Sequence, residues 1–454
     1  MTNLNPEVDT PRDGLYQTPH STIHYDVAVA GGGPAGIGAA VGAARRGAKV
    51  LLLERSGIPG GMGTSALVNN FCNAHFDGAR FIIGGIFAEL RDRLIARNAL
   101  YVTGGLEPYD HRVFIEEVTT LLAEFGVETR YNCKIDQVLF NESEAILLLE
   151  SGEEIHASTV VDATGDAHIA HLARVPYTMA ERSGVMPLTY CYLLGPIDLN
   201  RLKERHPSAF RNDTRTGESY VHLGGQEWLV ERVRQARECG DLTIPRERIA
   251  VAYSVPGSPE VISVNFGRVR IKDPTDEKEM ARAKEEGLRQ VHEGVAFFRK
   301  YVAGFEEAGV VELADQIGVR ESRQIDGVYR LTGEDVLSGR QFDDVIAQCC
   351  YHVDIHDPDT DSTTLVVLPH GTHYDIPLRS LIPTAGPDNL IVAGRCISAT
   401  QEAMSSFRVS PSVMAIGEAA GTAAALAAQS RCPIRAIPAK SVQEALRSGG
   451  AILE

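Results

Sequence analysis

The stretch YDVAVAGGGPAGIGAAVGAARRGAKVLLLE, residues 25–54, decides the fold of this chain. An apolar run typical of a buried strand comes first, and Gly31, Gly33 and Gly36 follow it at G-x-G-x-x-G spacing. An Ala-rich segment then leads to a second apolar run that ends in Glu54. The order of strand, glycine turn, helix, strand and acid predicts a β-α-β unit at the start of a parallel sheet.

The three glycines also predict what the turn binds. Gly31 allows a tight turn, Gly33 lets a pyrophosphate approach the main chain, and Gly36 lets the helix pack closely on the strand. The helix N-terminus offers unpaired N–H groups and the positive end of the helix dipole to such an anion. Glu54 is placed to accept hydrogen bonds from a ribose. A dinucleotide site is therefore predicted, with a purely structural glycine turn as the alternative.

Composition excludes several classes of function. The chain has 454 residues, which gives a prior of roughly two or three domains. A formal net charge of -16 argues against binding to nucleic acids or acidic membranes. No apolar stretch is long enough to span a bilayer. The eight cysteines form no C-x-x-C pair, which favours reduced thiols in a cytoplasmic protein. The polar residues 1–22 lack the pattern of a secretion signal and are expected to form a flexible N-terminal arm.

Further segments extend the dinucleotide pattern. RSGIPGGMGTS, residues 55–65, adds the glycine pair Gly60 and Gly61. GVETRYNCKIDQVLF, residues 126–140, has a strand pattern, and TVVDATGD, residues 159–166, closes a strand on a glycine turn. DNLIVAGRCIS, residues 388–398, is another buried-strand pattern, and a long Ala-rich helix follows it.

Together these segments resemble the two-dinucleotide-fold flavoproteins of the glutathione-reductase type. Within them the chain is most similar to the FAD-dependent oxidoreductases related to the flavoprotein subunits of succinate dehydrogenase and fumarate reductase. The resemblance implies an α/β fold with a discontinuous, Rossmann-like FAD-binding domain, residues 23–180 and 380–454. An inserted α+β substrate (cap) domain, residues 181–379, would cover the flavin.

The resemblance also implies which residues bind FAD. Many relatives have Asp directly after the glycine of the C-terminal strand, whereas Arg395 follows Gly394 here. Because arginine cannot accept a hydroxyl proton, the contact with the ribityl chain must differ. Ser410 and Pro411 predict an N-cap and first turn for a helix whose N-terminus points at the pyrimidine edge of the flavin. The implied cofactor residues are Gly31, Gly33, Pro34, Ala35, Gly36, Glu54, Arg55, Gly60, Gly61, Met62, Cys133, Lys134, Ile135, Ala163, Thr164, Gly165, Gly394, Arg395 and Ser410.

Catalytic groups are expected in the cap and at its junctions, because the flavin carries the redox chemistry while the protein places the substrate and moves protons. Histidine has the pKa of a base that takes the proton of a hydroxyl or amine. Arginine holds an anion with bidentate geometry. The predicted catalytic residues are His356, His352, Tyr374, Arg379 and Arg408.

These residues also have plainer explanations. His352, Asp354 and His356 alternate along one strand face, which suits a polar wall facing the flavin or an ordinary surface strand. A metal site is less favoured, and no metal is predicted. Arg379 and Arg408 would equally serve to tie the cap to the FAD domain.

Other polar and thiol groups leave alternatives open. Arg320 and Arg323 bracket Glu321, so an internal ion-pair network competes with a role in substrate binding. Cys72, after the second glycine pair, would allow a covalent link to the flavin, although packing is favoured.

The predicted function is that of an FAD-dependent dehydrogenase or oxidase, which oxidises a small polar substrate by hydride transfer to flavin. Whether the substrate is anionic stays open. The alternatives are a flavin-dependent reductase or monooxygenase with an external donor, and a non-redox FAD-containing subunit of a complex. The expected partner is a small molecule rather than nucleic acid or membrane, and homo-oligomer formation is left open.

Overall fold

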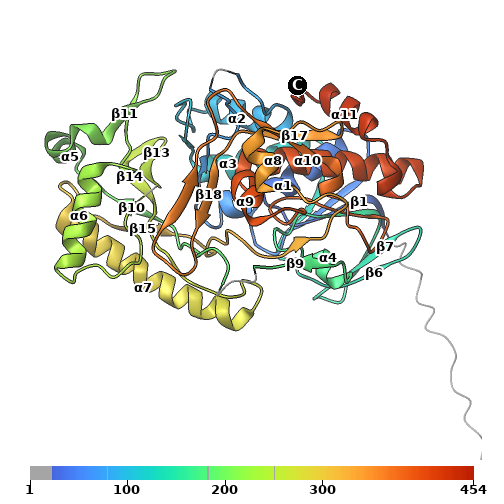
Figure 1. The fold of residues 1–454 in the computed structure, drawn as a ribbon, viewed down its shortest axis with the longest axis horizontal. Helices are drawn as coiled ribbons and strands as arrows, with labels where there is room; N and C mark the ends of the chain where they lie inside the picture. Colours follow the sequence, from blue (N-terminus) through green and yellow to red (C-terminus); the bar gives the residue numbers. More distant parts are fainter. Residues whose placement is uncertain (1–22, 79, 181–183, 250) are drawn as a thin grey trace, which may run out of the picture.

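The computed structural model describes residues 23–78, 80–180, 184–249 and 251–454, so the predicted arm at 1–22 lies outside the described residues. Two lobes lie side by side along the longest axis of the molecule (Figure 1). The first combines the N-terminal and C-terminal parts of the chain, and the second is built from its middle. Within the described ranges, no helix combines the length and apolar character that crossing a bilayer requires.

A seven-stranded sheet forms the centre of the first lobe, in the order β5-β2-β1-β8-β7-β6, with β21 also paired to β8. Strands β1, β2, β5, β8 and β21 run parallel, while β6 and β7 pair antiparallel. The register aligns Ala30 with Leu53 and with Asp162, so three parallel strands end at one edge. The strands are β1 (His24–Ala30), β2 (Val50–Leu53), β5 (Glu128–Arg130), β6 (Ile135–Phe140), β7 (Ala145–Leu149), β8 (Glu154–Asp162) and β21 (Leu390–Val392).

Two Gly- and Ala-rich helices join the ends of the chain. A Cβ atom on Gly38 of α1 (Pro34–Ala44) would lie 2.2 Å from the carbonyl oxygen of Met414, in α10 (Ser410–Ser430). A Cβ atom on Gly421 would lie 1.9 Å from the carbonyl oxygen of Ala39. The two backbones therefore touch, and only glycine allows this approach. This contact places the C-terminal helix beside the first β-α-β unit.

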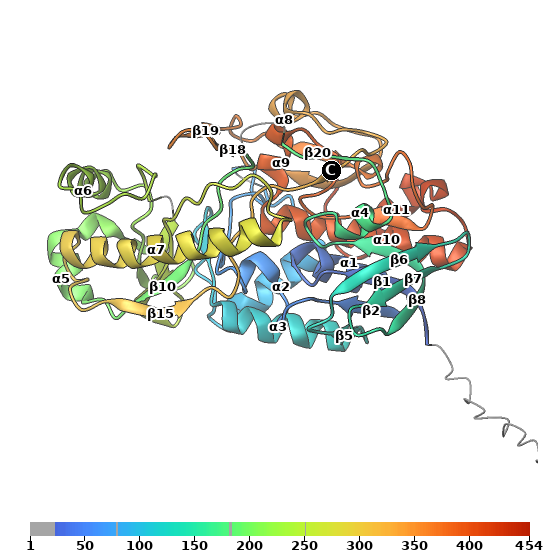
Figure 2. The same cartoon turned by 90° about the horizontal axis from the view of Figure 1, so that it is seen from below.

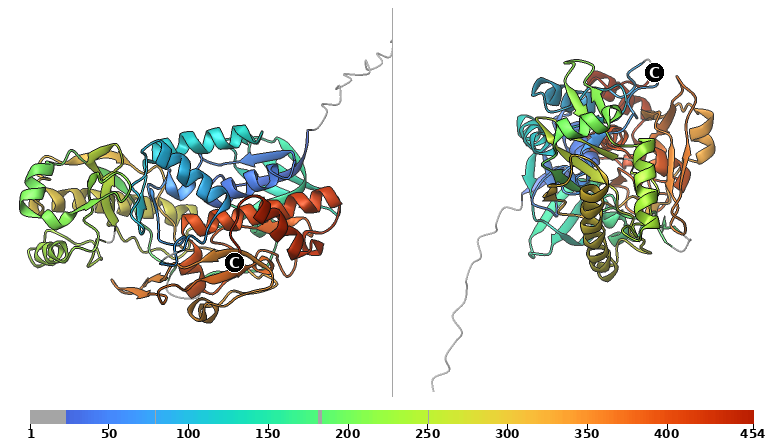
Figure 3. Two further views of the ribbon diagram at one scale, coloured as in Figure 1. Left: turned by 90° about the horizontal axis from the view of Figure 1, so that it is seen from above. Right: turned by 90° about the vertical axis from the view of Figure 1, so that its left-hand side faces the viewer.

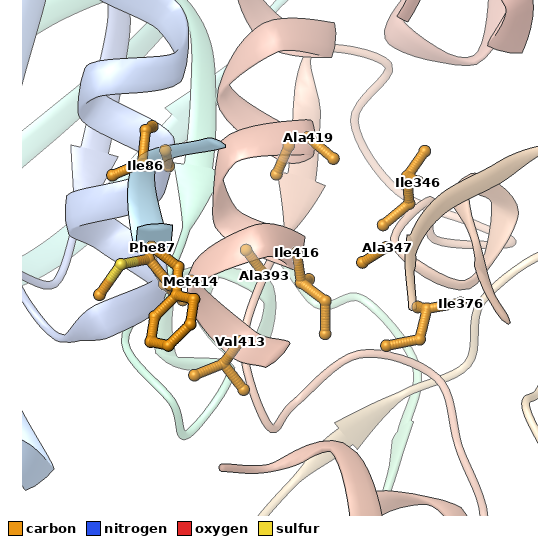
Figure 4. Close-up of a cluster of buried hydrophobic side chains, with 14 of the residues drawn as sticks. Ile86, Phe87, Ile346, Ala347, Ile376, Ala393, Val413, Met414, Ile416 and Ala419 are labelled. Carbon is orange, nitrogen blue, oxygen red and sulfur yellow. The ribbon is translucent and has the colours of Figure 1, made fainter. Parts of the chain in front are cut away.

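The other face of α10 completes the core of this lobe. Figure 4 shows Ile416 of α10 between Phe87 of α2 (Gly85–Ala96) and Ile346 and Ile376. The last two residues belong to β17 (Val345–Cys349) and β20 (Tyr374–Pro377), which pair antiparallel. The domain boundary at residue 380 stays a prediction, although β17 and β20 share the first lobe's core. Helices α3 (His111–Glu124), α9 (Gln401–Phe407) and α11 (Ala439–Ser448) also belong to this lobe.

The second lobe has an antiparallel sheet in the order β13-β14-β10-β15 and a core of its own that includes Phe266, Phe297 and Phe298. The long helix α7 runs along this lobe (Figure 2). Asp276 caps α7 by accepting bonds from two backbone N–H groups. The elements are β10 (Tyr192–Gly195), β13 (Val251–Val255), β14 (Ser258–Asn265), β15 (Gly309–Leu313), α5 (Leu199–Arg205), α6 (Glu227–Glu238) and α7 (Glu277–Tyr301).

The predicted α/β fold class, with a Rossmann-like domain and an α+β second lobe, is confirmed. The views of Figure 3 show the N-terminal and C-terminal segments together in the first lobe. A hairpin of β18 (Val353–His356) and β19 (Thr363–Val366) carries part of the site described below. The remaining short elements are β3 (Asn70–Phe71), β4 (Glu107–Pro108), β9 (Tyr177–Thr178), β11 (Phe210–Asn212), β12 (Ser219–Val221), β16 (Gln324–Ile325), α4 (His168–Leu172) and α8 (Gly333–Ser338).

Candidate cofactor and substrate site

The glycines of the turn after β1 differ in what surrounds them: Gly31 and Gly36 are closely packed, and Gly33 borders open space. A Cβ atom on Gly31, whose φ is +99°, would lie 2.6 Å from the carbonyl oxygen of Ala163. A Cβ atom on Gly36 would lie 1.7 Å from the carbonyl oxygen of Gly31. In contrast, a Cβ atom on Gly33, the N-cap of α1, would meet no atom within 4 Å. The helix N-terminus therefore opens onto space that the described residues leave unfilled.

Two other segments meet at this space. A Cβ atom on Gly61 would lie 3.1 Å from the Cα atom of Gly33, and one on Gly394 would lie 3.3 Å from the Cβ atom of Ala35. The N–H group of Gly60 donates to the carbonyl oxygen of Gly32 at 2.8 Å. No side chain caps the N-terminus of α1. Since its first N–H groups have no intrahelical partner, the arrangement fits a bound pyrophosphate.

Glu54 connects the glycine turn to the loop after β2. The carboxylate is 7% exposed, and it accepts bonds from the N–H groups of Gly32 at 2.5 Å and Ser56 at 2.7 Å. A carboxylate has about four acceptor sites, so capacity remains for a ribose hydroxyl. The N–H group of Cys133 donates to the carbonyl oxygen of Glu54 at 2.9 Å, so the predicted adenine-flanking segment lies beside it. The neighbouring Lys134 is directed to the surface, 3.6 Å from Glu150.

The turn after β8 is held by its own side chains. Thr164 donates to Oδ1 of Asp162 through its N–H group at 3.1 Å and its hydroxyl at 2.7 Å. The N–H group of Ala163 donates to the carbonyl oxygen of Ala30 at 2.8 Å. These bonds place Gly165, with φ at +78°, directly against the C-terminal turn.

Arg395 has a partner that the sequence pattern did not indicate. Nη2 of Arg395 lies 2.5 Å from Oδ1 of Asp166, and its guanidinium lies over Gly165. Burial raises the pKa of Asp166, but the charges of Arg395 and Arg55 lower it further, so the net shift is downward. Nε of Arg395 is buried and has no partner among the described residues. Arg395 thus pairs with a carboxylate of the protein itself, and its Nε is left as a donor without a partner among the described residues.

Ser410 does not cap α10, so that prediction is wrong. Helix α10 begins at Ser410, and its N-cap is Val409, which makes no side-chain hydrogen bond. Val409 has extended backbone angles and Pro411 lies in the first turn, where the missing N–H group costs nothing. The N-terminus of α10 therefore resembles that of α1 in having no side-chain cap.

The structure brings two of the predicted catalytic residues, His356 and Arg408, together with Asp354. Oδ2 of Asp354 lies 3.4 Å from Nε2 of His356 and 3.4 Å from Nη2 of Arg408. Arg408 also donates to the carbonyl oxygen of Asp354 at 3.0 Å. The hydroxyl of Thr363 lies 3.2 Å from Nδ1 of His356, a contact that either tautomer satisfies. These contacts tie the hairpin of β18 and β19 to the C-terminal end of α9, just before α10 begins.

Two further arginines face this group. Nη1 of Arg246, in the loop between α6 and β13, donates to Oδ1 of Asn265 at 3.0 Å, and Nη2 of Arg320 lies 3.4 Å from the same atom. Arg320 also donates to Oγ1 of Thr189 at 2.7 Å and to the carbonyl oxygen of Pro187. The sequence left the role of Arg320 open, and no motif pointed to Arg246, which stands in an ordinary loop.

Burial and mutual repulsion shift the pKa values of these groups. Burial, reinforced by Arg246, lowers the pKa of Arg320 to about 9, and burial lowers that of Arg246 to about 10. Burial, with the charge of Arg320, lowers the pKa of His356 to about 3. Burial raises the pKa of Asp354, but His356 and Arg408 hold it well below its usual range. At neutral pH the imidazole is therefore neutral and the carboxylate ionised.

Tyr374 and Arg379 have other surroundings in the described part of the chain. The buried hydroxyl of Tyr374 donates to Oγ of Ser406 at 2.7 Å, and burial raises its pKa well above the usual value. Arg379 lies over the ring of Tyr329 and 3.5 Å from Asp344, near the surface. These contacts belong to the first lobe's own packing, so we leave both residues out of the proposed catalytic group.

His352 and the thiols have mainly structural contacts. The ring of His352 packs against that of Tyr351, with centroids 4.0 Å apart and the planes tilted by 32°, and burial lowers the pKa of His352. Burial raises the pKa of Cys72 to about 12, which keeps it a thiol. His75, three residues further along the chain, has a side chain that is 1% exposed and lies 3.2 Å from Glu107. No set of three or more His, Cys, Asp or Glu side chains suited to a metal lies among the described residues.

Comparisons with known proteins agree with the cofactor geometry. The family described as FAD dependent oxidoreductase matches residues 26–446. The chain is similar to thiamine thiazole synthase of Desulfosudis oleivorans, with 29% identity over 192 residues, 38% of this chain and 69% of that protein.

Solved structures give weaker likenesses. A Diels-Alderase of pyrroindomycin biosynthesis aligns with a TM-score of 0.46 and 14% identity, over 93% of this chain and 69% of that chain. A geranylgeranyl bacteriochlorophyll reductase-like protein of Thermoplasma acidophilum aligns with a TM-score of 0.42 and 14% identity, over 94% and 83%. The finer resemblance to glutathione reductase and to the succinate dehydrogenase group stays a prediction. The chain belongs to the family of FAD dependent oxidoreductases and is an FAD-dependent enzyme.

Proposed function

We propose that the protein is a two-electron dehydrogenase or oxidase that oxidises a small polar substrate, with FAD as the hydride acceptor. The observation that carries this proposal is the neutral imidazole of His356 beside the ionised carboxylate of Asp354. Arg320, Asp354 and Arg408 lie in the interior and still keep part of their surface accessible to solvent. A small substrate has a route to such groups.

Gly318 lies between the second glycine loop and the residues around Arg320. A Cβ atom on Gly318 would lie 3.1 Å from Cε of Met62, in the second glycine loop, and 3.2 Å from the carbonyl oxygen of Thr189. The hydroxyl of Thr189 accepts the bond from Arg320. The glycine loop therefore leads directly to the proposed substrate groups.

The residues present fit FAD. Gly33 and Gly61 leave the backbone open to a pyrophosphate, Glu54 has acceptor capacity for the ribose, and Nε of Arg395 is an unused donor. When bound, FAD supplies a two-electron acceptor for the hydride. The chain's own groups bind and orient the substrate and take up the proton.

His356 is the proposed proton acceptor. As the C–H bond of the substrate breaks with its electron pair leaving as hydride, the hydroxyl or amino group on the same carbon gives its proton to Nδ1 of His356, which the hydroxyl of Thr363 also contacts at 3.2 Å. Nε2–H faces Oδ2 of Asp354 at 3.4 Å, and this carboxylate stabilises the imidazolium that forms. The product has a C=O or C=N bond in place of the two broken bonds.

Anaerobic reduction of the flavin tests the proposal. Holoenzyme is mixed without oxygen with hydroxy acids, amino acids, amines and polyols, and the loss of the oxidised flavin band is followed. One donor class is expected to bleach the flavin in stoichiometric amount. If no such donor reduces the flavin while NADH or NADPH does, the enzyme is a reductase or monooxygenase with an external donor, and the proposal is wrong.

A further inference from the structure

Arg246 is a buried residue, and one edge of its guanidinium makes no hydrogen bond to the described residues. The residue is 6% exposed. Its hydrogen bonds to described residues all use Nη1, which donates to Oδ1 and the carbonyl oxygen of Asn265 at 3.0 and 3.2 Å and to the carbonyl oxygen of Gly267 at 3.5 Å. Within the described part of the chain, Nε and Nη2 make no hydrogen bond.

Another arginine of the same protein shows what this edge binds. Nε and Nη2 of Arg91 donate to the two carboxylate oxygens of Glu107, each at 2.7 Å. This fork of two parallel bonds is the geometry that guanidinium and carboxylate groups share. Arg246 presents the same two nitrogen atoms, but the protein supplies no carboxylate to them among the described residues.

The charges around Arg246 favour an added anion. The charges of Arg268 and Arg320 face it, and Asp354 is the acidic group that acts on it most. That carboxylate already contacts His356 and Arg408. Asp361 and Asp357 act on Arg268. Arg246, Arg320 and Arg408 still outnumber Asp354, while His356 is neutral. Buried charge without compensation is costly, so an anionic ligand would relieve the repulsion between the arginines.

From this geometry we infer that Arg246 binds a carboxylate of the substrate through Nε and Nη2, with the charge of Arg320 beside it. The substrate is thus a small carboxylic acid whose oxidised carbon carries a hydroxyl or amino group. This inference rests on the proposed function and names its substrate class. Burial depresses the pKa of His356 most, and the charge of Arg320 lowers it further; an anion beside Arg320 would offset the second effect and make the histidine a stronger base.

The test measures binding rather than turnover. Oxalate and its neutral analogue oxamide are titrated into holoenzyme, and the perturbation of the visible flavin spectrum is followed. Oxalate is expected to bind saturably and oxamide not to bind. Removing one partner of a buried charge pair costs several kcal/mol, so Arg246→Gln should weaken oxalate binding about 30- to 1000-fold.

The control variant is Arg248→Gln in the same loop. Arg248 is exposed and pairs with Glu227 at 2.7 Å, so its substitution should leave oxalate affinity and FAD content unchanged. If Arg246→Gln does not fold, Arg246→Lys keeps the charge but loses the fork, and binding should still weaken at least about tenfold.

Three results would overturn the inference: no saturable oxalate binding to the unmodified protein, equal binding of oxamide, or unchanged affinity in both Arg246 variants. Failure of the proposed function is a separate result. In that case no donor reduces the flavin, while oxalate still binds in an Arg246-dependent manner.

Discussion

Substitution of Gly33 by valine separates cofactor binding from folding. Gly33 has a φ of -71° and an extended backbone, which any residue adopts, and a Cβ atom there meets no protein atom within 4 Å. Valine is a less favourable N-cap residue, which costs about 0.5–1 kcal/mol of folding free energy. Valine also lowers the conformational entropy of the unfolded chain relative to glycine, which stabilises the folded state by a similar amount. The free energy of unfolding of the apoprotein should therefore change by less than about 1 kcal/mol.

The affinity for FAD should fall far more. The valine side chain would stand where the pyrophosphate approaches the first N–H groups of α1. Losing two hydrogen bonds to a charged group costs about 1.5–3 kcal/mol each, or about 3–6 kcal/mol together. This corresponds to a dissociation constant about 10² to 10⁴ times higher.

The assay combines fluorescence titration of apoprotein with FAD and urea unfolding of the apoproteins, because bound cofactor itself stabilises the folded state. Gly36→Ala is the positive control for misfolding, since its Cβ atom would lie 1.7 Å from a backbone oxygen. Gly309→Ala, at a site with open space around it, is the neutral control. Unweakened FAD binding by Gly33→Val, or loss of its fold, would refute the reasoning.

Three other predictions follow from the geometry. Arg395→Gln should weaken FAD binding about 10- to 100-fold in a fluorescence titration, because the bond expected from Nε to the cofactor is lost. The double exchange Asp166→Arg with Arg395→Asp should not restore FAD binding, and restored binding would contradict this role of Arg395. His356→Gln should slow flavin reduction about 10² to 10⁴-fold without changing flavin content, whereas the surface change His370→Gln should have no effect; an unaltered rate would exclude His356 as the base. Burial raises the pKa of Glu418 from the ordinary 4.5 to about 7, so its contribution to stability is full below pH 4.5 and is lost as the pH rises through about 7. In Glu418→Gln, the free energy of unfolding in urea should therefore change less between pH 5 and 8, by up to about 3 kcal/mol. An equal pH dependence in both proteins would count against this role of Glu418.

The sequence predicted those parts of the site that depend on residues close together in the chain. Strand, glycine spacing and helix lie within one stretch, so the β-α-β unit and the roles of Gly31 and Gly36 follow from steric rules alone. The contact of α1 with α10 is different, because its glycines are far apart in the chain. Gly38 and Gly421 acquire their function only when the two helices cross.

The residues proposed to bind the substrate could not be predicted, because their roles depend on contacts between segments that are distant in the sequence. Arg246 lies in an ordinary polar loop, and it becomes notable only because folding buries it and brings Arg320 to the same asparagine. Tyr374 and Arg379 stand close in sequence to the catalytic segment, yet β20 directs Tyr374 into the first lobe's core. The Arg395 pair with Asp166 joins two turns that are distant in sequence.

A crystal structure of the holoenzyme with FAD and oxalate would show both binding sites at once. We expect the pyrophosphate between Gly33 and Gly61, and oxalate held by Nε and Nη2 of Arg246 on the flavin face nearest His356. A flavin ring directed away from Arg246 and His356, with oxalate bound elsewhere, would contradict this expectation.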